Sequence, residues 1–189
     1  MIDTEREGLA KIPKWRYEQI ERAVVKLYKE QRVHKFPVDP FEIIASKGYV
    51  LIPFSRLSFN AFISVMDGKN EAFSFFSPEI KNYVIIYDDD KSLQRIRFTL
   101  MHEIGHIVLG HRCESDLARK EADYFAGYAL APSPAIAEYT NSEVQEIVSK
   151  FWVSPECAEI CKLRCSNWLR YGGAYLRDYE RDLLGIIRE

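Results

Sequence analysis

Residues 98–109 read Phe-Thr-Leu-Met-His-Glu-Ile-Gly-His-Ile-Val-Leu. Within this stretch His102 and His106 are four positions apart, so on a helix both imidazoles project from one face. Two imidazoles placed in this way can bind a single Zn²⁺. Glu103 follows the first histidine directly, and its carboxylate can take a proton from a metal-bound water. The stretch therefore predicts a zinc-dependent hydrolytic site, with His102 and His106 as ligands and Glu103 as general base.

The residues around the two histidines are mostly apolar, which predicts a buried helix. A buried helix that carries two His and one Glu needs partners for those polar groups. The alternative is that a His-Glu-x-x-His pattern arises by chance on an amphipathic helix, in about one chain in a few hundred. Because chance does not account for buried polar groups, we favour the metal site.

The motif does not extend into the longer pattern of the metzincins. In that pattern a Gly lies three residues after the second His, and a further His lies six residues after it. Here Gly110 and His111 follow His106 by four and five residues, which is out of register. We therefore expect His111 to lie at the surface near the C-terminus of the helix, where a partial positive charge is favourable.

The composition is that of a globular protein with one domain. The chain has 189 residues, of which 47% are hydrophobic and 29% charged, so it can bury a substantial core. The formal net charge of −2 gives no overall attraction to nucleic acid or to an anionic membrane. No apolar stretch is long enough to span a bilayer, and residues 1–7 lack the apolar core of an export signal. We expect a cytoplasmic protein with no direct nucleic-acid or membrane partner.

Three of the four cysteines are four residues apart, at positions 157, 161 and 165. This spacing places them on one face of a helix and differs from the Cys-x₂-Cys pairs of zinc ribbons. In a reducing compartment the thiols would be free. We therefore expect buried cysteines that act as small hydrophobic residues, in preference to a metal cluster.

Upstream of the motif, the sequence predicts a helix followed by a small sheet. Apolar residues at helical spacing indicate a helix over residues 15–32. Asp39 and Pro40 are typical of the N-cap and first position of a short helix, which would end near residue 47. The turn residues 67–70 predict a hairpin. The predicted strands, rich in β-branched and aromatic residues, are 49–52, 60–66, 72–76 and 83–87.

From the motif onward, the chain is predicted to be helical. We expect residues 88–90 to cap the motif helix, and the following helix to stop at residues 131–134, which read Ala-Pro-Ser-Pro. A helix, then a sheet, then helices imply an α+β domain with segregated layers and a small, mostly antiparallel sheet. We predict a single domain over residues 1–189, with a core at 15–131 and C-terminal helices at 132–189. The predicted helices of this part are 91–110, 114–130, 141–150, 155–170 and 174–187.

Residues 142–165 have the pattern of a helix-turn-helix, which makes a DNA-binding module the main rival class. The second of these two helices would begin with Glu156 and Glu159 and no basic residue. Acidic side chains at that position would repel phosphates, and base-reading residues are expected there instead. We interpret the two helices as a packing pair that contacts a protein partner.

Four segments occur in a fixed order: residues 36–40, 95–106, 121–126 and 128–132. They read Phe-Pro-Val-Asp-Pro, Arg-Ile-Arg-Phe-Thr-Leu-Met-His-Glu-Ile-Gly-His, Glu-Ala-Asp-Tyr-Phe-Ala and Tyr-Ala-Leu-Ala-Pro. Together they resemble the ImmA/IrrE-type zinc metallopeptidase family, over roughly residues 15–170. The resemblance implies a gluzincin-like, zincin-type fold, in which an edge strand near residues 60–66 can pair with an extended substrate. Members typically cleave or inactivate helix-turn-helix repressors encoded beside them, often on mobile elements or prophages.

The resemblance also implies the rest of the ligand set. In this family the third zinc ligand is a Glu four residues before an Asp or Asn that supports a ligand His. Asp123 matches the supporting residue, but the position four residues earlier holds Arg119, which cannot ligate a cation. Glu121 is the nearest carboxylate and is our candidate third ligand, although it is turned about 200° from Arg119 on a helix. Asp123 is the alternative third ligand. The remaining possibility is a site in which only two His and water molecules bind the zinc ion.

These observations predict a zinc-dependent endopeptidase that acts on a helix-turn-helix repressor of a mobile element or prophage. The alternative is a catalytically degenerate regulator that keeps the fold and binds the repressor without cleaving it. Arg119 at the third-ligand position is the feature that favours this alternative. A DNA-binding protein is the third and least favoured class.

Overall fold

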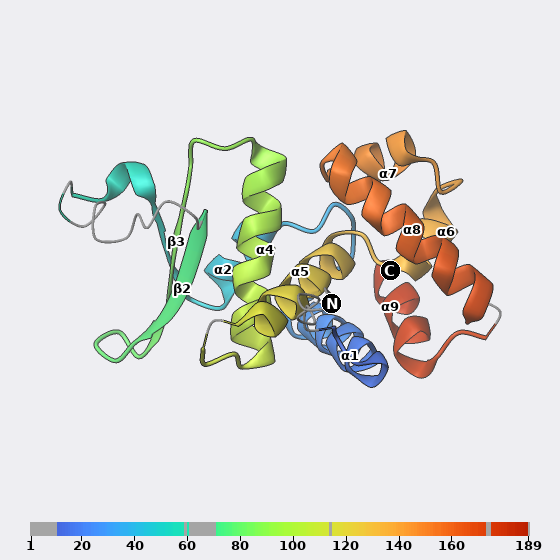
Figure 1. Cartoon of the computed structure of the whole chain (residues 1–189), viewed down its shortest axis with the longest axis horizontal. Helices are drawn as coiled ribbons and strands as arrows, with labels where there is room; N and C mark the ends of the chain where they lie inside the picture. Colours follow the sequence, from blue (N-terminus) through green and yellow to red (C-terminus); the bar gives the residue numbers. More distant parts are fainter. Residues whose placement is uncertain (1–10, 59, 61–70, 114, 173–174, 189) are drawn as a thin grey trace, which may run out of the picture.

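The computed structural model of the chain describes residues 11–58, 60, 71–113, 115–172 and 175–188. A small sheet lies at one end of the molecule, helices fill the centre, and the C-terminal helices form the other end (Figure 1). This segregation confirms the predicted α+β class. In the described part of the chain, no helix is long and apolar enough to cross a membrane. The elements are α1 (Lys14–Gln31), α2 (Pro40–Ser46), β1 (Val50–Pro53), the 3₁₀ helix η1 (Phe54–Arg56), β2 (Ala72–Ser77), β3 (Asn82–Tyr87), α4 (Leu93–Leu109), α5 (Asp116–Leu130), α6 (Ser133–Tyr139), α7 (Val144–Phe151), α8 (Pro155–Tyr171) and α9 (Asp178–Arg188).

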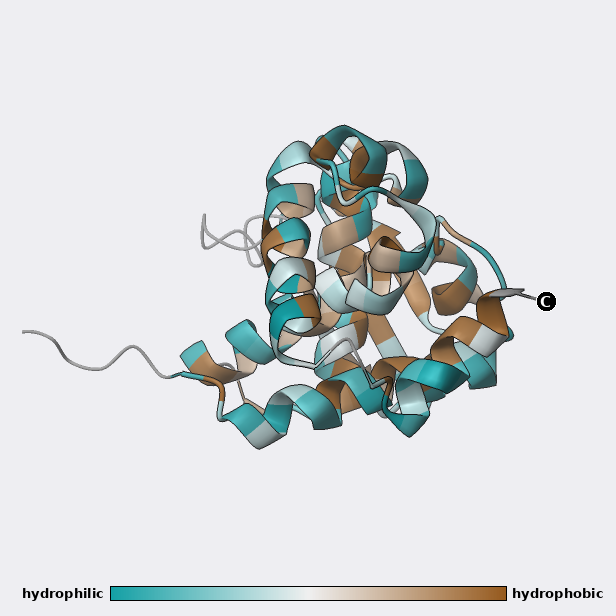
Figure 2. Ribbon diagram, turned by 90° about the vertical axis from the view of Figure 1, so that its right-hand side faces the viewer, coloured by the Kyte–Doolittle hydropathy of each residue, from teal (hydrophilic) through white to brown (hydrophobic). Residues whose placement is uncertain are grey.

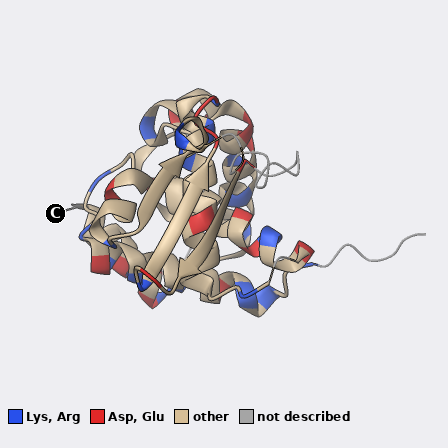
Figure 3. Cartoon of the chain, turned by 90° about the vertical axis from the view of Figure 1, so that its left-hand side faces the viewer, with Lys and Arg blue, Asp and Glu red and all other residues tan. Residues whose placement is uncertain are grey.

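The described strands form one sheet in the order β1-β3-β2. β3 runs parallel to β1 and antiparallel to β2, with Val84 opposite Val50 and Tyr87 opposite Ala72. The three strands carry no charged side chain, and Figure 3 shows them crossing this end of the molecule with helices behind them. The strand predicted over residues 60–66 cannot be compared with the structure, because residues 61–66 lie outside the described part of the chain.

Helix α4 is the element that carries the metal motif, and both of its ends are fixed by local chemistry. The Ser92 side chain accepts a hydrogen bond from the backbone N–H of Arg95 at 3.3 Å, which caps the first turn. The prediction that residues 88–90 cap this helix was wrong, because the chain continues past them before the helix begins. At the other end Gly110 has a φ of 71°, the left-handed conformation that ends a helix at low cost for glycine.

Helices α4 and α5 pack closely because Gly105 of the motif has no side chain. A Cβ at Gly105 would lie 3.0 Å from Cδ1 and 3.2 Å from Cβ of Phe125. Phe125 is fully buried, so its ring has no free space into which it could move. The glycine therefore sets the distance at which α5 crosses the histidine face of α4.

A buried arginine connects α4 to the C-terminal helices. Arg97 is 2% exposed, and its guanidinium donates to the carbonyl of Val38 at 2.7 Å and to the carbonyls of Phe151 and Trp152. The guanidinium also lies over the indole ring of Trp152, at 4.9 Å from the ring centroid. Burial lowers the pKa of Arg97 below its usual value. The carbonyls at the end of α7 thus hold this helix against the metal-motif helix.

The C-terminal helices agree with the predicted pair around residues 152–154, since α7 ends at Phe151 and α8 begins at Pro155. Hydrophobic and hydrophilic positions alternate around the helices at this end of the molecule (Figure 2). The sequence analysis missed α6, because the two prolines at 132 and 134 suggested a break. Pro134 occupies the first turn of α6, where a missing N–H costs no helical hydrogen bond.

The cysteines of α8 are free thiols, as predicted. Cys161 and Cys165 are buried, and their thiols contact the backbone carbonyls of Gly127 and Ser133 at 3.7 and 3.6 Å. Cys157 is partly buried at the start of the same row. These residues pack α8 against the central helices, which is the role expected of small hydrophobic side chains.

Replacing Gly105 by Ala should destabilise the protein by about 1–3 kcal/mol, because the added methyl group meets the immobile Phe125. Gly185→Ala in α9 is the matched control, since a Cβ there has no heavy atom within 4 Å. Alanine's higher helix propensity should make that control stabilising by about 0.5–1 kcal/mol. Urea unfolding of both variants measures the two effects. Equal free energies of unfolding for Gly105→Ala and Gly185→Ala would contradict the packing described here.

Candidate metal centre

The two histidines of α4 approach each other through one nitrogen of each ring. His102 Nε2 and His106 Nε2 are 3.0 Å apart, and the ring centroids are 4.7 Å apart. Two ring nitrogens at this distance attract each other only if a proton or a cation lies between their lone pairs. The positions of the protons on the other two ring nitrogens therefore decide what this pair can bind.

Asp123 of α5 fixes the proton of His102. Its Oδ1 atom lies 2.8 Å from His102 Nδ1. The carboxylate accepts a hydrogen bond from Nδ1–H, which leaves Nε2 of His102 with a free lone pair. This contact is what the predicted supporting role of Asp123 requires.

A longer chain of contacts fixes the proton of His106. His111 Nε2 lies 3.0 Å from Oε2 of Glu121, so this nitrogen donates its proton to the carboxylate. Nδ1 of His111 is then an acceptor, and it lies 3.0 Å from His106 Nδ1, which must donate. The proton of His106 is thereby placed on Nδ1. Both Nε2 atoms consequently carry lone pairs that face each other, which fits a bound cation.

His111 is the residue whose role the sequence analysis missed. The prediction of a surface position was wrong, because the His111 side chain is only 11% exposed. The left-handed Gly110 turns the chain back on the helix, and the N–H of His111 donates to the carbonyl of His106 at 3.0 Å. The available signal was a His that directly follows a helix-ending Gly, which brings its ring beside the last helical turn.

Glu121 is held away from the histidine pair. Its carboxylate accepts from Arg16 at 2.6 Å and from His111 at 3.0 Å, and its side chain is 7% exposed. Burial by itself would raise the pKa of Glu121, but the hydrogen bonds from Arg16 and His111 outweigh it and lower the pKa. As a zinc ligand Glu121 therefore stays an untested prediction, and in this structure its carboxylate instead orders the proton of His106 through His111.

Among the described residues, no group of three His, Cys, Asp or Glu side chains is arranged to hold a metal ion. Arg119, at the position where the sequence resemblance implies a third ligand, lines the same cleft as His102, His106 and Asp123. Glu121 does not line this cleft, as its position on the opposite side of α5 requires. The donor set thus fits a zinc ion through two imidazole nitrogens.

Glu103 lies between α4 and the sheet. It is 6% exposed, and its Oε2 atom accepts a hydrogen bond from Ser74 Oγ at 2.7 Å. Ser74 belongs to β2, and both residues line the cleft of about 760 Å³ that contains the histidine pair. The hydroxyl holds the carboxylate in place beside the metal-binding face. Sequence analysis did not identify Ser74, because only the folded sheet brings β2 over α4.

Glu121→Gln should lower the free energy of unfolding by about 1–3 kcal/mol at neutral pH, since it removes the charge that pairs with Arg16. The folded pKa of Glu121 is lowered, so its contribution is present above the unfolded carboxyl pKa of about 4.3 and is lost as pH falls through the folded value. The difference between wild type and variant should therefore shrink towards pH 3. Urea unfolding at both pH values measures it.

Arg16→Gln is the control for this prediction. It should give a similar loss, and the double variant should lose less than the sum of the two single changes. An unchanged free energy of unfolding in Glu121→Gln, together with a large loss of zinc affinity, would instead identify Glu121 as the third ligand.

Comparison with known families places this geometry in context. The model of peptidase family M78, the IrrE N-terminal-like domain, matches residues 55–160, which is more than half of the chain. The match contains the whole of α4 and α5 with the histidine pair, Glu103 and Asp123. A comparison with curated proteins gives no match. The chain belongs to the ImmA/IrrE-type metallopeptidase family, through its IrrE N-terminal-like domain.

Proposed function

We propose that this protein is a zinc-dependent peptidase that cleaves a protein partner. The observation that carries the proposal is the proton order around the histidine pair. Asp123 and the Glu121–His111 chain place the protons of His102 and His106 on Nδ1, so two Nε2 lone pairs face each other 3.0 Å apart. A cation between them turns this repulsion into attraction.

His102 and His106 are the residues that would hold the zinc ion. When bound, zinc lowers the pKa of a water molecule and polarises the carbonyl of the peptide bond. Asp123 keeps the His102 ring oriented and makes Nε2 a stronger donor. His111 and Glu121 do the same for His106.

Glu103 is the proposed general base. Its carboxylate is adjacent to the metal-binding face and is fixed by the Ser74 hydroxyl. Low exposure keeps bulk water from competing for the carboxylate oxygens. Glu103 takes a proton from the attacking water and later gives it to the leaving amine.

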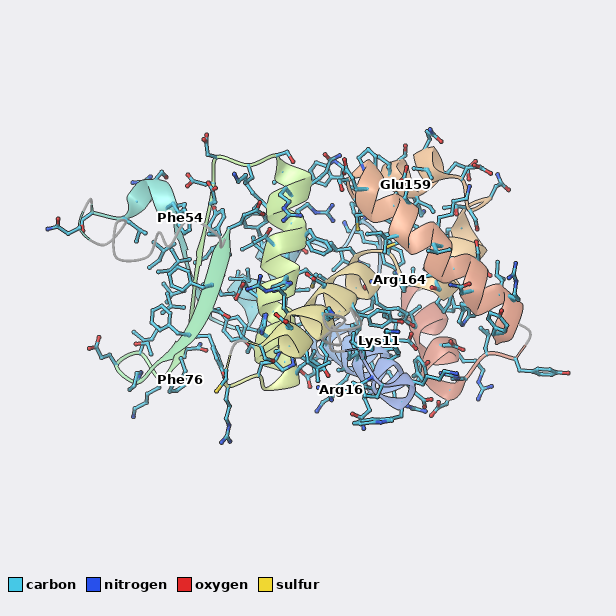
Figure 4. All side chains as sticks on the ribbon, in the orientation of Figure 1. Lys11, Arg16, Phe54, Phe76, Glu159 and Arg164 are labelled. Atoms are coloured by element: carbon cyan, nitrogen blue, oxygen red, sulfur yellow. The ribbon has the colours of Figure 1, made fainter. Side chains whose placement is uncertain are left out.

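The substrate is proposed to lie extended along β2. Within the described sheet β2 is an outer strand, and its residues line the cleft that contains the histidine pair. A strand edge offers backbone hydrogen bonds to an extended peptide. Phe75 and Phe76 are 45% and 52% exposed on β2, and they give this edge an apolar character (Figure 4). These features support a protein substrate in preference to a small molecule.

The partner that the family resemblance implies is a helix-turn-helix repressor. The acidic start of α8, with Glu156 and Glu159, supports a protein partner over DNA for the C-terminal helices. The proposed target is therefore the repressor protein itself, without direct contact between this chain and nucleic acid.

A catalytically degenerate regulator is the second candidate, and one observation favours it. Arg119 lines the metal cleft at the position where the family pattern has a carboxylate ligand. A guanidinium there adds positive charge beside the zinc position and cannot coordinate it. In this case the cleft would bind the repressor and leave it intact.

Glu103→Gln tests the choice between these functions. In a peptidase it should lower the rate of repressor cleavage by about 10²–10⁴-fold, because the general base is lost while the side-chain shape remains. Glu42→Gln is the matched control, since Glu42 is exposed on α2 and lines neither the metal cleft nor the larger cavity beside it. Gel analysis of a helix-turn-helix repressor incubated with each zinc-loaded protein measures cleavage.

Cleavage by wild type and Glu42→Gln but not by Glu103→Gln supports the peptidase. Equal cleavage by all three proteins would show that Glu103 is not the base. Binding of the repressor without cleavage, in wild type and both variants, would establish the regulator.

A further inference from the structure

A second, larger cavity continues from the metal cleft towards the C-terminal helices. It has a volume of about 1600 Å³ and is lined mainly by residues of α5 and α8, with further residues from α1, α4 and α9. Arg95, Phe98 and Asp123 line both this groove and the metal cleft. The groove and the metal cleft therefore adjoin each other, which places the groove within reach of a chain bound at the histidine pair. The volume exceeds the roughly 300–1,000 Å³ of small-molecule sites, which points to a peptide segment.

Arg164 of α8 is built into the wall of this groove. Its guanidinium lies over the ring of Tyr124, at 4.6 Å from the ring centroid (Figure 4). It also packs against Gly127, where a Cβ would lie 2.5 Å from Arg164 Nη1. A side chain at position 127 would displace the guanidinium, so the two helices leave a fitted place for it.

No described carboxylate forms an ion pair with Arg164, although several acidic side chains line the same groove. Each of those side chains has other partners. Glu21 accepts from the hydroxyls of Tyr124 and Tyr179, and Glu180 accepts from the Trp168 ring N–H and the Arg177 backbone N–H. Glu18 pairs with Arg177.

A second cation also lines the groove. This is Lys11, which Figure 4 labels, and no ion pair joins it to a described carboxylate. What favours an anionic ligand is Arg164 itself, a cation in the groove wall with no described carboxylate partner. A planar guanidinium supported on an aromatic ring is suited to bidentate binding of a carboxylate.

We propose that Arg164 binds a carboxylate of the protein substrate, so that the groove selects a chain with an Asp or Glu beyond the segment held at the metal cleft. This inference rests on the proposed function for the identity of the substrate, but its physical basis is the groove alone. Arg164 would then be a specificity residue, which binds substrate away from the bond that is cut.

The test measures peptide binding in the full-length Glu103→Gln protein, so that cleavage does not interfere. The probe is a fluorescein-labelled decapeptide of alternating Glu and Ala with an amidated C-terminus, and alternating Gln and Ala is its uncharged counterpart. Fluorescence anisotropy gives the dissociation constant of each peptide. We expect tighter binding of the Glu peptide, and Arg164→Gln should weaken that binding about tenfold while leaving the Gln peptide unchanged.

Two further variants separate charge from structure. Arg164→Lys keeps the charge and should retain part of the preference for the Glu peptide. Arg170→Gln is the matched control, because Arg170 is exposed on the same helix and does not line the groove. It should leave both dissociation constants as in the parent protein. A purely structural role of Arg164 would weaken both peptides equally and would overturn the proposal.

A free C-terminus on the Gln-Ala peptide tests the other source of a carboxylate. Binding that depends on the free terminus and on Arg164 would assign the site to a chain end, and would overturn the side-chain proposal. The Glu preference in the Glu103→Gln protein is independent of catalysis. If wild type cuts no repressor but Arg164 still selects the Glu peptide, the proposed function fails and the carboxylate site stands. If wild type cuts the repressor but neither peptide is preferred, the carboxylate site fails and the proposed function stands.

Discussion

The two Nε2 lone pairs that face each other on α4 are the constraint around which the candidate site is arranged. They are 3.0 Å apart, and carboxylates on both sides draw the ring protons away from them. Asp123 acts directly on His102, whereas Glu121 acts on His106 through His111. Lone pairs forced together in this way carry an electrostatic cost that a cation relieves. The residues that surround the histidine pair therefore favour the binding of a metal ion between the two Nε2 atoms.

The fold supplies these carboxylates by bringing α5 across α4 at close range. Gly105, inside the metal motif, permits the contact with Phe125 that sets this distance. Asp123 is two residues before Phe125, so the same contact places its carboxylate at His102. On the opposite side, β2 brings Ser74 to Glu103. The glycine of the motif therefore contributes to the site, because it determines how near the supporting helix lies.

Much of the fold followed from local sequence patterns, since strong apolar periodicity and β-branched runs decide element type. α6 was missed because two prolines suggest a break, whereas Pro132 is the N-cap of this helix and Pro134 lies in its first turn. The motif residues were predictable because they are close in sequence on one helix, whereas the supporting role of Asp123 came from the family resemblance. The contacts of Ser74 and Arg16 were not predictable, because each joins elements distant in the chain and depends on packing angles. The contact of His111 with His106 is local, and its signal, the helix-ending Gly110, was overlooked. The groove at Arg164 was not predictable either, because residues of α5 and α8, which are distant in the chain, line it together.

Calorimetric titration of Zn²⁺ into metal-free protein, with His102→Ala measured alongside wild type, tests whether the histidine pair binds a metal ion. We expect one zinc per wild-type chain, because the two Nε2 lone pairs face each other. We expect binding to be lost in His102→Ala, because one of the two ligands is then missing. Absence of zinc binding by the wild type, or equal binding by wild type and variant, would contradict the assignment of the histidine pair as a metal site.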